Sequence, residues 1–245
     1  MTVQISIIGM GQIGTSIGLA LAQHTELVLR VGHDRELAAA NLAKKMGALD
    51  RVDINIPHAV EEAGLVILAV PLDQVRDTMQ AVARDLRPDV VVMDLAPVKE
   101  SVLAWAAELL PAGAHYVGLV PVVNPNYLQS HGAGAADAHA DLFQNGLFAV
   151  VSPSGTPSEA IKLATDLSQL LGAEHLFIDP VELDSMMAAT HLLPQLMAAA
   201  LLNATVDQPG WREARMLTGQ PFAEATGPAA LFDQTGALIQ AAQGS

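Results

Sequence analysis

The sequence has no cysteine among its 245 residues, and only 4% of its residues are aromatic. Without cysteine, disulfide bonds and thiolate chemistry are excluded, which is consistent with the reducing cytoplasm, where we expect the protein to act. With so few aromatic side chains, the core must be built from Ala, Val, Leu, Ile and Met. The length is enough for one large or two smaller domains, and hydrophobic residues still make up 51% of the chain, so a sizeable core is available.

Positive charge is also scarce: 12 Lys and Arg stand against 26 Asp and Glu, for a net charge of −14. Such a chain repels nucleic acid and anionic membranes, so we expect neither as a partner. After Lys99 the only Lys and Arg residues are Lys162, Arg212 and Arg215. A small anionic substrate held by the second half would therefore depend on these few cations.

Signals for export, membrane insertion and metal binding are missing as well. The N-terminus lacks the basic region and cleavage site of a signal peptide. No uninterrupted apolar run has the length needed to span a bilayer. No group of His, Asp and Glu has the spacing of metal ligands, so we expect no metal site.

A glycine-rich turn between a strand and a helix is the most informative feature that is present. An apolar run over 3–8 leads into the turn, and Asp34 ends a second apolar run, 20 residues after the last glycine. The turn consists of Gly9-Met10-Gly11-Gln12-Ile13-Gly14. A strand before the turn, a helix after it and an acidic residue at this distance are the context of a dinucleotide site.

Each position of the turn has a physical role in such a site. Gly9 permits the tight turn, Gly11 lets the backbone approach a pyrophosphate, and Gly14 lets the helix lie close to the sheet. Gln12 and Ile13 begin the helix, whose N-terminus offers free N–H groups and partial positive charge to phosphate. These five residues are the predicted centre of the cofactor site.

Asp34 indicates which dinucleotide is bound. Its carboxylate can accept hydrogen bonds from both ribose hydroxyls and repels the 2′-phosphate of NADP. NAD is therefore the expected cofactor, and NADP is less favoured. Arg35 could accommodate a 2′-phosphate, but we interpret it as a solvent-facing residue beside the adenine.

Strands and helices alternate through the first 100 residues, and further strands and a helix follow up to residue 178. Predicted strands are 3–8, 27–32, 65–70, 90–94, 115–120, 147–152 and 175–178, and predicted helices are about 12–23, 35–47, 73–86, 98–110 and 157–171. The early strands are continuously apolar, as in a parallel sheet covered on both faces. We predict an α/β, Rossmann-type doubly wound sheet, whose ligands bind beyond the strands' carboxyl ends. Val70, Pro71 and Pro97 then belong to the cofactor site.

The pattern changes after Asp179-Pro180. Residues 181–204 are predicted to form a long helix kinked at Pro194, followed by helices at 211–217 and 228–242. We therefore expect a dinucleotide-binding domain over 1–179 and a helical domain over 180–245. The second is small for a core of its own, so we expect it to pack on the first domain and on a second subunit, as in a homodimer.

Several segments together resemble the prephenate/arogenate dehydrogenase family, the oxidoreductases of tyrosine biosynthesis, over nearly the whole chain. The glycine turn looks like the family's cofactor loop. The other segments are similar to its fourth-strand signature, its D-x-x-S-V-K segment, the stretch leading into the next strand and its G-F-R-D-x-x-R segment. In chain order they are Leu65-Val66-Ile67-Leu68-Ala69-Val70-Pro71, Asp94-Leu95-Ala96-Pro97-Val98-Lys99, Gly134-Ala135-Ala136-Asp137 with Leu142-Phe143, and Gly210-Trp211-Arg212-Glu213-Ala214-Arg215-Met216.

The resemblance implies a Rossmann domain and a helical dimerisation domain with the active site between them. The family transfers a hydride from a ring carbinol to the nicotinamide, and loss of CO2 makes the ring aromatic. A loop histidine assists at the reacting hydroxyl, a serine helps to position it, and an arginine holds a substrate carboxylate. That arginine matches Arg215, and Arg212 lies on nearly the same helix face. The alternative for both is a solvated helix face.

Two positions depart from the family's pattern. Its serine falls on Pro97 and its His-Pro pair on Val120-Pro121, and neither proline nor valine can move a proton. General base assistance contributes typically about 10²–10⁴-fold in rate, so these departures matter. Replacement groups could come from the loop over 122–131, which holds Asn124, Asn126, Tyr127 and His131.

His191 and Gln195 offer a second source of replacement groups. They are four residues apart on one predicted helix, so they share a face and could point into the cleft. The alternative, which we favour, is a core histidine bonded to a carbonyl freed by Pro194. Lys99 either starts a helix near the cofactor or is a surface residue.

Three functions remain open on these residues. The first is an NAD-dependent oxidoreductase of the prephenate dehydrogenase type, which Arg215 favours. The second is a dinucleotide-binding protein of the same fold with lost or altered activity, which Pro97 and Val120 favour. The third is an imine or keto reductase relative; a β-hydroxyacid dehydrogenase would require a lysine on the interdomain helix, and no lysine follows Lys162.

Overall fold

The computed structural model describes residues 2–128 and 132–231. The chain divides into two compact units with a boundary after Pro180. The first unit is an α/β fold, and the described part of the second is helical. The predicted fold class, a mainly parallel doubly wound sheet followed by helices, is confirmed.

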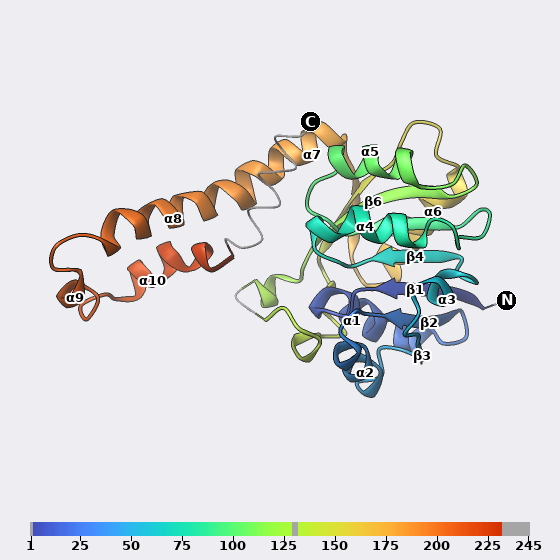
Figure 1. Ribbon diagram of the computed structural model, residues 1–245, viewed down its shortest axis with the longest axis horizontal. Coiled ribbons are helices and arrows are strands. Elements are labelled where there is room, and N and C mark those ends of the chain that lie inside the picture. The colour runs from blue at the N-terminus through green and yellow to red at the C-terminus, as the bar shows by residue number, and fades with distance from the viewer. Residues whose placement is uncertain (1, 129–131, 232–245) are drawn as a thin grey trace. The chain divides into compact units, whose positions relative to one another are not determined.

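The first unit is built around one eight-stranded sheet with the order β3-β2-β1-β4-β5-β6-β7-β8 (Figure 1). Its strands are β1 (Val3–Ile8), β2 (Val28–His33), β3 (Arg51–Val52), β4 (Leu65–Leu68), β5 (Val91–Asp94), β6 (His115–Val122), β7 (Leu147–Val151) and β8 (Glu174–Phe177). Neighbouring strands are parallel except for β6 and β7. The order reverses between β1 and β4, which is where ligands of such sheets bind.

Helices connect the strands by crossovers and flank the sheet (Figure 1). They are α1 (Gln12–Ala20), η1 (Leu21–His24), α2 (Leu37–Lys45), α3 (Ile56–Val60), α4 (Leu72–Val82), α5 (Glu100–Leu109) and α6 (Ser158–Leu170). Two short 3-10 turns, η2 (Pro125–Tyr127) and η3 (Ala135–Asp137), lie between β6 and β7. Because crossovers are right-handed, α1 and α2 cover the opposite face from α4 and α5.

The register of the parallel strands brings their carboxyl ends into one row. Ile8 pairs with His33 on one side and with Leu68 on the other. Leu68 pairs with Asp94, which pairs in turn with Gly118. The loops that follow these residues therefore gather at one edge of the sheet.

The core of this unit is aliphatic, as the composition predicts. Ile7, Ile67 and Met93, which lie on adjacent strands, have no solvent exposure. Phe143 and Phe148 add the main aromatic pair, with ring centroids 5.3 Å apart. The strand β3 and the helix α3 have no counterpart in the sequence-based prediction.

The second unit begins with one long helical run. It comprises α7 (Pro180–Met187), the π-helical turn η4 (Ala188–Leu192) and α8 (Leu193–Val206), followed by α9 (Trp211–Ala214), α10 (Gln220–Thr226) and η5 (Gly227–Leu231). Most of the predicted helix 228–242 lies outside the described residues.

The run Pro180–Val206 is long and apolar enough to cross a membrane by length and composition, with a hydropathy of 1.3 over its most apolar window, 17% of which is buried. The sequence-based expectation counted uninterrupted apolar residues, whereas this run includes Glu182, Asp184 and His191. One helix of this kind is weak evidence for a membrane, because core helices of soluble proteins pass the same test.

Candidate dinucleotide site

The turn between β1 and α1 depends on two glycines for steric reasons. Gly9 has a φ of +99°, and a Cβ atom there would lie 2.4 Å from the Ala69 carbonyl oxygen. A Cβ atom at Gly14 would lie 2.0 Å from the Gly9 carbonyl oxygen. Both distances are far below van der Waals contact, so any larger residue would push α1 away from the sheet. The backbone thus shows the packing that the motif predicts.

Asp34 joins the end of β2 to the glycine turn. Its Oδ2 accepts a hydrogen bond of 2.6 Å from the Met10 N–H, and its Oδ1 accepts one of 2.7 Å from the Glu36 N–H. The carboxylate is half-buried, whereas Arg35 beside it is exposed. A carboxylate held in this way keeps further lone pairs for other donors.

The remaining predicted cofactor residues lie along the same sheet edge. Val70 and Pro71 follow β4, and Pro97 lies in the loop after β5. Val70 and Pro97 are half-buried, and Pro71 is exposed at the start of α4. Val120 lies within β6, two residues past the row of strand ends, and is buried.

A buried polar cluster supports the loop after β5. The Lys99 ammonium lies 2.7 Å from Asp94 Oδ1, and the Tyr116 hydroxyl donates a 2.5 Å hydrogen bond to Asp94 Oδ2. Lys99 and Asp94 are wholly buried, so the interpretation of Lys99 as a surface residue is wrong. Gly118 makes room for the lysine, because a Cβ atom there would lie 2.7 Å from Lys99 Cδ.

Residues 132–139, which lie between β6 and β7 in the sequence, contact the N-terminal end of α1. The Gln12 N–H donates to the Ala133 carbonyl at 2.9 Å, and Gln12 Nε2 donates to the Asp137 carbonyl at 3.0 Å. The His139 N–H donates to Ser16 Oγ at 3.0 Å. Figure 1 shows the turn η3 beside α1 and α2.

Asn124 and Tyr127 hold the first part of the segment between β6 and β7. Asn124 is buried; its Oδ1 accepts from the Asn126 N–H at 3.0 Å, and its Nδ2 donates to the Asp141 carbonyl at 3.3 Å. The Tyr127 ring stacks on His139, and its hydroxyl donates to Asp141 Oδ1 at 2.7 Å. That hydrogen bond raises the pKa of Tyr127 above its ordinary value of 10.0. The predicted residue His131 lies outside the described residues.

In the second unit, His191 lies in the π-helical turn. The N–H of Leu193 bonds to the Ala188 carbonyl, five residues back, and the Thr190 hydroxyl lies 2.9 Å from His191 Nδ1. The residue is exposed in the single chain, so the interpretation as a core histidine is wrong. Desolvation of its ring still lowers the pKa of His191 below its ordinary value of 6.5. π-Helical turns are frequent at functional sites.

The other predicted residues of this unit differ in exposure. Gln195 lies in α8 and is only 8% exposed, so its side chain is buried. Arg212 lies in α9 and Arg215 directly follows it, and both side chains are exposed. Exposed guanidinium groups are available to a carboxylate.

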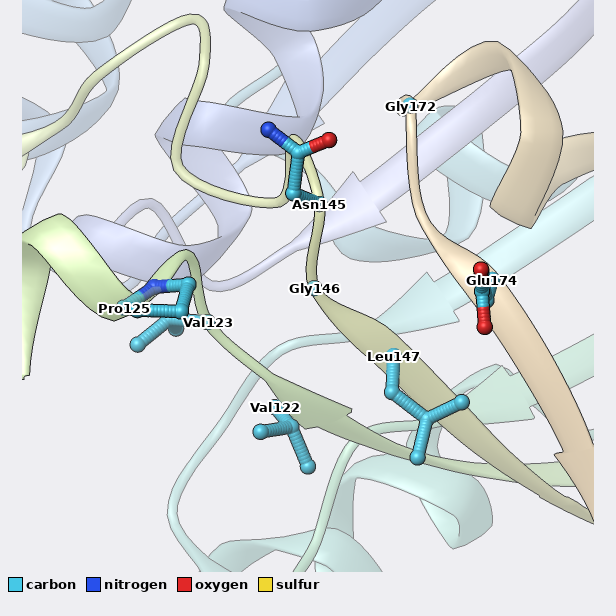
Figure 2. Close-up of a pocket in the computed structure, with 8 residues that line it drawn as sticks. All are labelled: Val122, Val123, Pro125, Asn145, Gly146, Leu147, Gly172 and Glu174. Atoms are coloured by element: carbon cyan, nitrogen blue, oxygen red, sulfur yellow. The ribbon is translucent and has the colours of Figure 1, made fainter.

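An open groove lies farther along the sheet, where β6 ends and β7 and β8 begin (Figure 2). Its volume is about 380 Å³, and its lining includes the carboxylate of Glu174 but no cationic side chain. The lining residues are Val122, Val123, Pro125, Asn145, Gly146, Leu147, Gly172 and Glu174. Its charge does not suit an anionic substrate.

The sequence did not predict the contacts that residues 132–139, between β6 and β7, make with α1. A glycine-rich stretch predicts a loop, but nothing in its residues states where the loop goes. The packing of Ala133 and Asp137 on Gln12 joins residues about 120 positions apart. A weak signal was present in Gly134-Ala135-Ala136-Asp137, whose small residues suit close packing.

A glycine turn at the point where the sheet order reverses, with an acidic residue after β2, defines a Rossmann-type dinucleotide-binding protein. The model of the family described as prephenate dehydrogenase, nucleotide-binding domain, matches residues 17–176. The chain therefore belongs to the prephenate dehydrogenase family. The match begins after Gly14, so the glycine turn supports a dinucleotide site independently of it.

Relatives with curated descriptions agree with this family. Prephenate dehydrogenase of Bacillus subtilis (strain 168) is 27% identical over 198 residues, covering 80% of this chain and 52% of the relative. Cyclohexadienyl dehydrogenase of Zymomonas mobilis subsp. mobilis is 30% identical over 199 residues, covering 81% of this chain and 66% of the relative. The chain thus spans between about half and two thirds of the length of these relatives.

The fold also matches solved structures. The crystal structure of prephenate dehydrogenase from A. aeolicus, solved with hydroxyphenyl propionate and NAD+, has a TM-score of 0.83 at 18% identity. The alignment covers 100% of this chain and 87% of that one. At this identity the likeness concerns the fold.

Proposed function

We propose that the protein is an NAD-dependent oxidoreductase that takes a hydride from a cyclic hydroxy acid such as prephenate or arogenate, with loss of CO2. The observation that carries the proposal is the glycine turn with Asp34, in a chain that belongs to the prephenate dehydrogenase family. The relatives named for prephenate and cyclohexadienyl dehydrogenation support the substrate class.

The residues at the sheet edge suit NAD. The close approach of Gly9 and Gly14 leaves the N-terminus of α1 against the sheet edge, where its N–H groups can bind phosphate. Asp34 would accept hydrogen bonds from the ribose hydroxyls and repel a 2′-phosphate. NAD supplies the hydride acceptor, the nicotinamide ring. Val70, Pro71 and Pro97 would form the wall along which this ring is oriented.

By the resemblance, Pro97 and Val120 would take the places of the family's serine and histidine, and neither side chain can accept a proton. Proton handling would then differ from the family's pattern. Among the described residues we propose His191 as the base, because it is an exposed imidazole in the π-helical turn of the second unit, and desolvation lowers its pKa and so favours the neutral form that accepts a proton. His131 is the second candidate. If His191 is the base, the rate falls as the pH drops through its pKa, below 6.5, and H191N abolishes this limb.

Substrate binding is assigned to the scarce cations of the second unit. Arg215 would hold a substrate carboxylate in a bidentate pair, with Arg212, three residues earlier, and Gln195 of α8 as secondary contacts. Asn124 is a weaker candidate for substrate binding, because both polar atoms of its side chain already bond within the loop.

Turnover with substrate tests this proposal. Prephenate, or arogenate, added with NAD should give an increase at the NADH absorbance band. The variant R215A should raise the KM for substrate by about tenfold or more, because charge-assisted hydrogen bonds are lost, while NAD binding is unchanged. R84A, which removes an exposed arginine of the first unit, is the matched control and should not change the KM.

A second function is favoured by Pro97 and Val120. A protein that keeps the cofactor site and lacks proton-transfer groups at both positions would bind NAD as a sensor or partner subunit without turnover. NAD binding without any NADH formation at high enzyme concentration, from either substrate, would select this function over the first.

We also propose that the protein is a homodimer that associates through its helical unit. The large apolar side chains of α8 are exposed in the single chain: Leu193 is 51% exposed, Met197 65% and Val206 41%. Exposed apolar surface of this extent is typical of interaction sites. A second copy of the chain is the occupant that the family resemblance favours.

A further inference from the structure

A segment of the protein's own backbone lies on the end of α1 that phosphate would contact. We call residues 132–139 the strap. Its Ala133 carbonyl accepts the Gln12 N–H at 2.9 Å. Two further bonds hold it: Gln12 Nε2 donates to the Asp137 carbonyl at 3.0 Å, and the His139 N–H donates to Ser16 Oγ at 3.0 Å.

The strap is packed rather than loosely laid on the helix. Ala135 is 5% exposed and Ala138 8%, so its small side chains are buried. A Cβ atom at Gly11 would lie 3.1 Å from the Ala133 carbonyl oxygen, which shows how closely the two backbones approach.

The strap also holds its own shape. The Asp137 carboxylate accepts the Gly134 N–H at 3.2 Å. A Cβ atom at Gly132 would lie 2.1 Å from Asp137 Cγ, so the backbone closes tightly around this carboxylate. The Asp137 side chain therefore closes a short turn by contacting residues 132 and 134 at its start.

This contact opposes phosphate binding for two reasons. A backbone N–H makes one strong hydrogen bond along its own direction, and the Gln12 N–H is already directed at the Ala133 carbonyl. Carbonyl and phosphate oxygens are both acceptors, so they cannot share that donor at short distance. Asp137, whose backbone carbonyl bonds to Gln12 Nε2, also gives the strap a negative charge, and the strap lies on a helix end that attracts anions.

We propose that the strap is a competing cap, which the pyrophosphate of the cofactor displaces from the Gln12 N–H. This inference rests on the proposed NAD function of the site. While the strap is bonded to the Gln12 N–H, the protein binds the cofactor weakly, and once the strap is displaced it binds the cofactor well. The apparent dissociation constant is then the intrinsic one divided by the fraction of molecules in which the strap is displaced.

Amide hydrogen exchange of the full chain, with and without NAD, tests the displacement. We expect NAD to slow exchange in the peptide that contains Gly9–Gly14 and to speed exchange at Asp137, Ala138 and His139. Protection of the glycine turn together with unchanged or slower exchange in the strap would overturn the inference and leave the NAD function standing. No protection in either segment, with no binding by calorimetry, would overturn both.

Strap variants separate its shape from its charge. D137A removes the acceptor of the Gly134 N–H and should tighten NAD binding by about tenfold, the value of one charge-assisted hydrogen bond. D137N keeps an acceptor and removes only the charge, so it should tighten binding less. Equal effects of the two variants would show that charge alone acts and would overturn displacement.

Ser16 provides an independent variant outside the strap. S16A removes the acceptor of the His139 N–H from the helix side, and it should also tighten NAD binding and speed exchange at His139. Circular dichroism melting of each variant shows whether it is folded. A folded S16A with unchanged or weaker NAD affinity would contradict the strap's role.

Discussion

Arg30 is a buried charge whose partners all come from neighbouring elements. It is 4% exposed. Its guanidinium bonds both oxygens of Asp50, at 3.1 and 2.7 Å, and donates to the Gly18 and Gly47 carbonyls. The residue therefore links β2 to α1 and to the turn after α2. Removing its carboxylate partner leaves a charge with little water to replace it.

The variant D50N should lower the free energy of unfolding by about 2 kcal/mol at pH 7, a value reduced because Asp50 is partly exposed. The hydrogen bonds from Arg30 lower the pKa of Asp50 in the folded protein below its ordinary value of 3.8. Its contribution is therefore complete above that value and is lost as the pH falls through the folded-state pKa. Urea unfolding at several pH values should show the two proteins converging in acid. A constant difference down to low pH would contradict this.

Lys99 and Asp94 form a second pair, with both side chains wholly buried. K99M leaves the Asp94 carboxylate with the Tyr116 hydroxyl and the Ala96 N–H as remaining partners. We expect a loss of about 3 kcal/mol in urea unfolding, because one charge stays buried without its counter-ion. The double variant K99M/D94N should recover part of this loss. A double variant less stable than K99M would show that the charge is not the cause.

For single residues, the sequence predicts the role of those that belong to a motif. It does not predict the role of residues whose surroundings in the folded protein decide it. Gly9, Gly14 and Asp34 follow from spacing, because the turn's sterics leave few alternatives. A single lysine in a sequence gives no sign of burial, so the sequence leaves two interpretations of Lys99, a helix start near the cofactor or a surface residue. Its burial depends on Gly118 of β6, which leaves space for the lysine side chain at the start of α5.

Among the elements, the β1–α1 unit shows the closest agreement between sequence and structure. The variant G14A should abolish detectable NAD binding and lower stability, because the new Cβ would lie 2.0 Å from the Gly9 carbonyl oxygen. The control G113A should do neither, since its Cβ would meet atoms only at 3.6 Å or beyond. NAD calorimetry and thermal melting check both variants. Normal NAD binding by G14A would refute the assigned role of the turn.

Elements with weak patterns were harder to predict. β3 has two residues and α3 five, too few for a visible period. Pro194 predicts a disturbed helix, because it lacks an N–H and its ring crowds the carbonyl four residues back. The structure shows the form of that disturbance, the π-helical turn over Ala188–Leu192. Which form relieves the clash depends on the surrounding packing.

For the whole molecule, composition predicts the aliphatic core and the absence of disulfides, but not the surface that a partner covers. We expect sedimentation equilibrium to show two chains per particle and M197E to yield single chains, because a charge would be buried at the proposed interface. The control I54E, at a 75% exposed position in the first unit, should leave the dimer intact. A wild-type protein that sediments as one chain, or that requires detergent, would contradict the dimer.

Calorimetric titration of the full chain with NAD and with NADP tests the central claim most directly. The turn Gly9–Gly14 and Asp34 predict saturable binding of NAD, with NADP at least about tenfold weaker because Asp34 repels its 2′-phosphate. Tighter binding of NADP would refute the role of Asp34. Absence of binding by either dinucleotide, for the wild type and D137A alike, would contradict the assignment of this site.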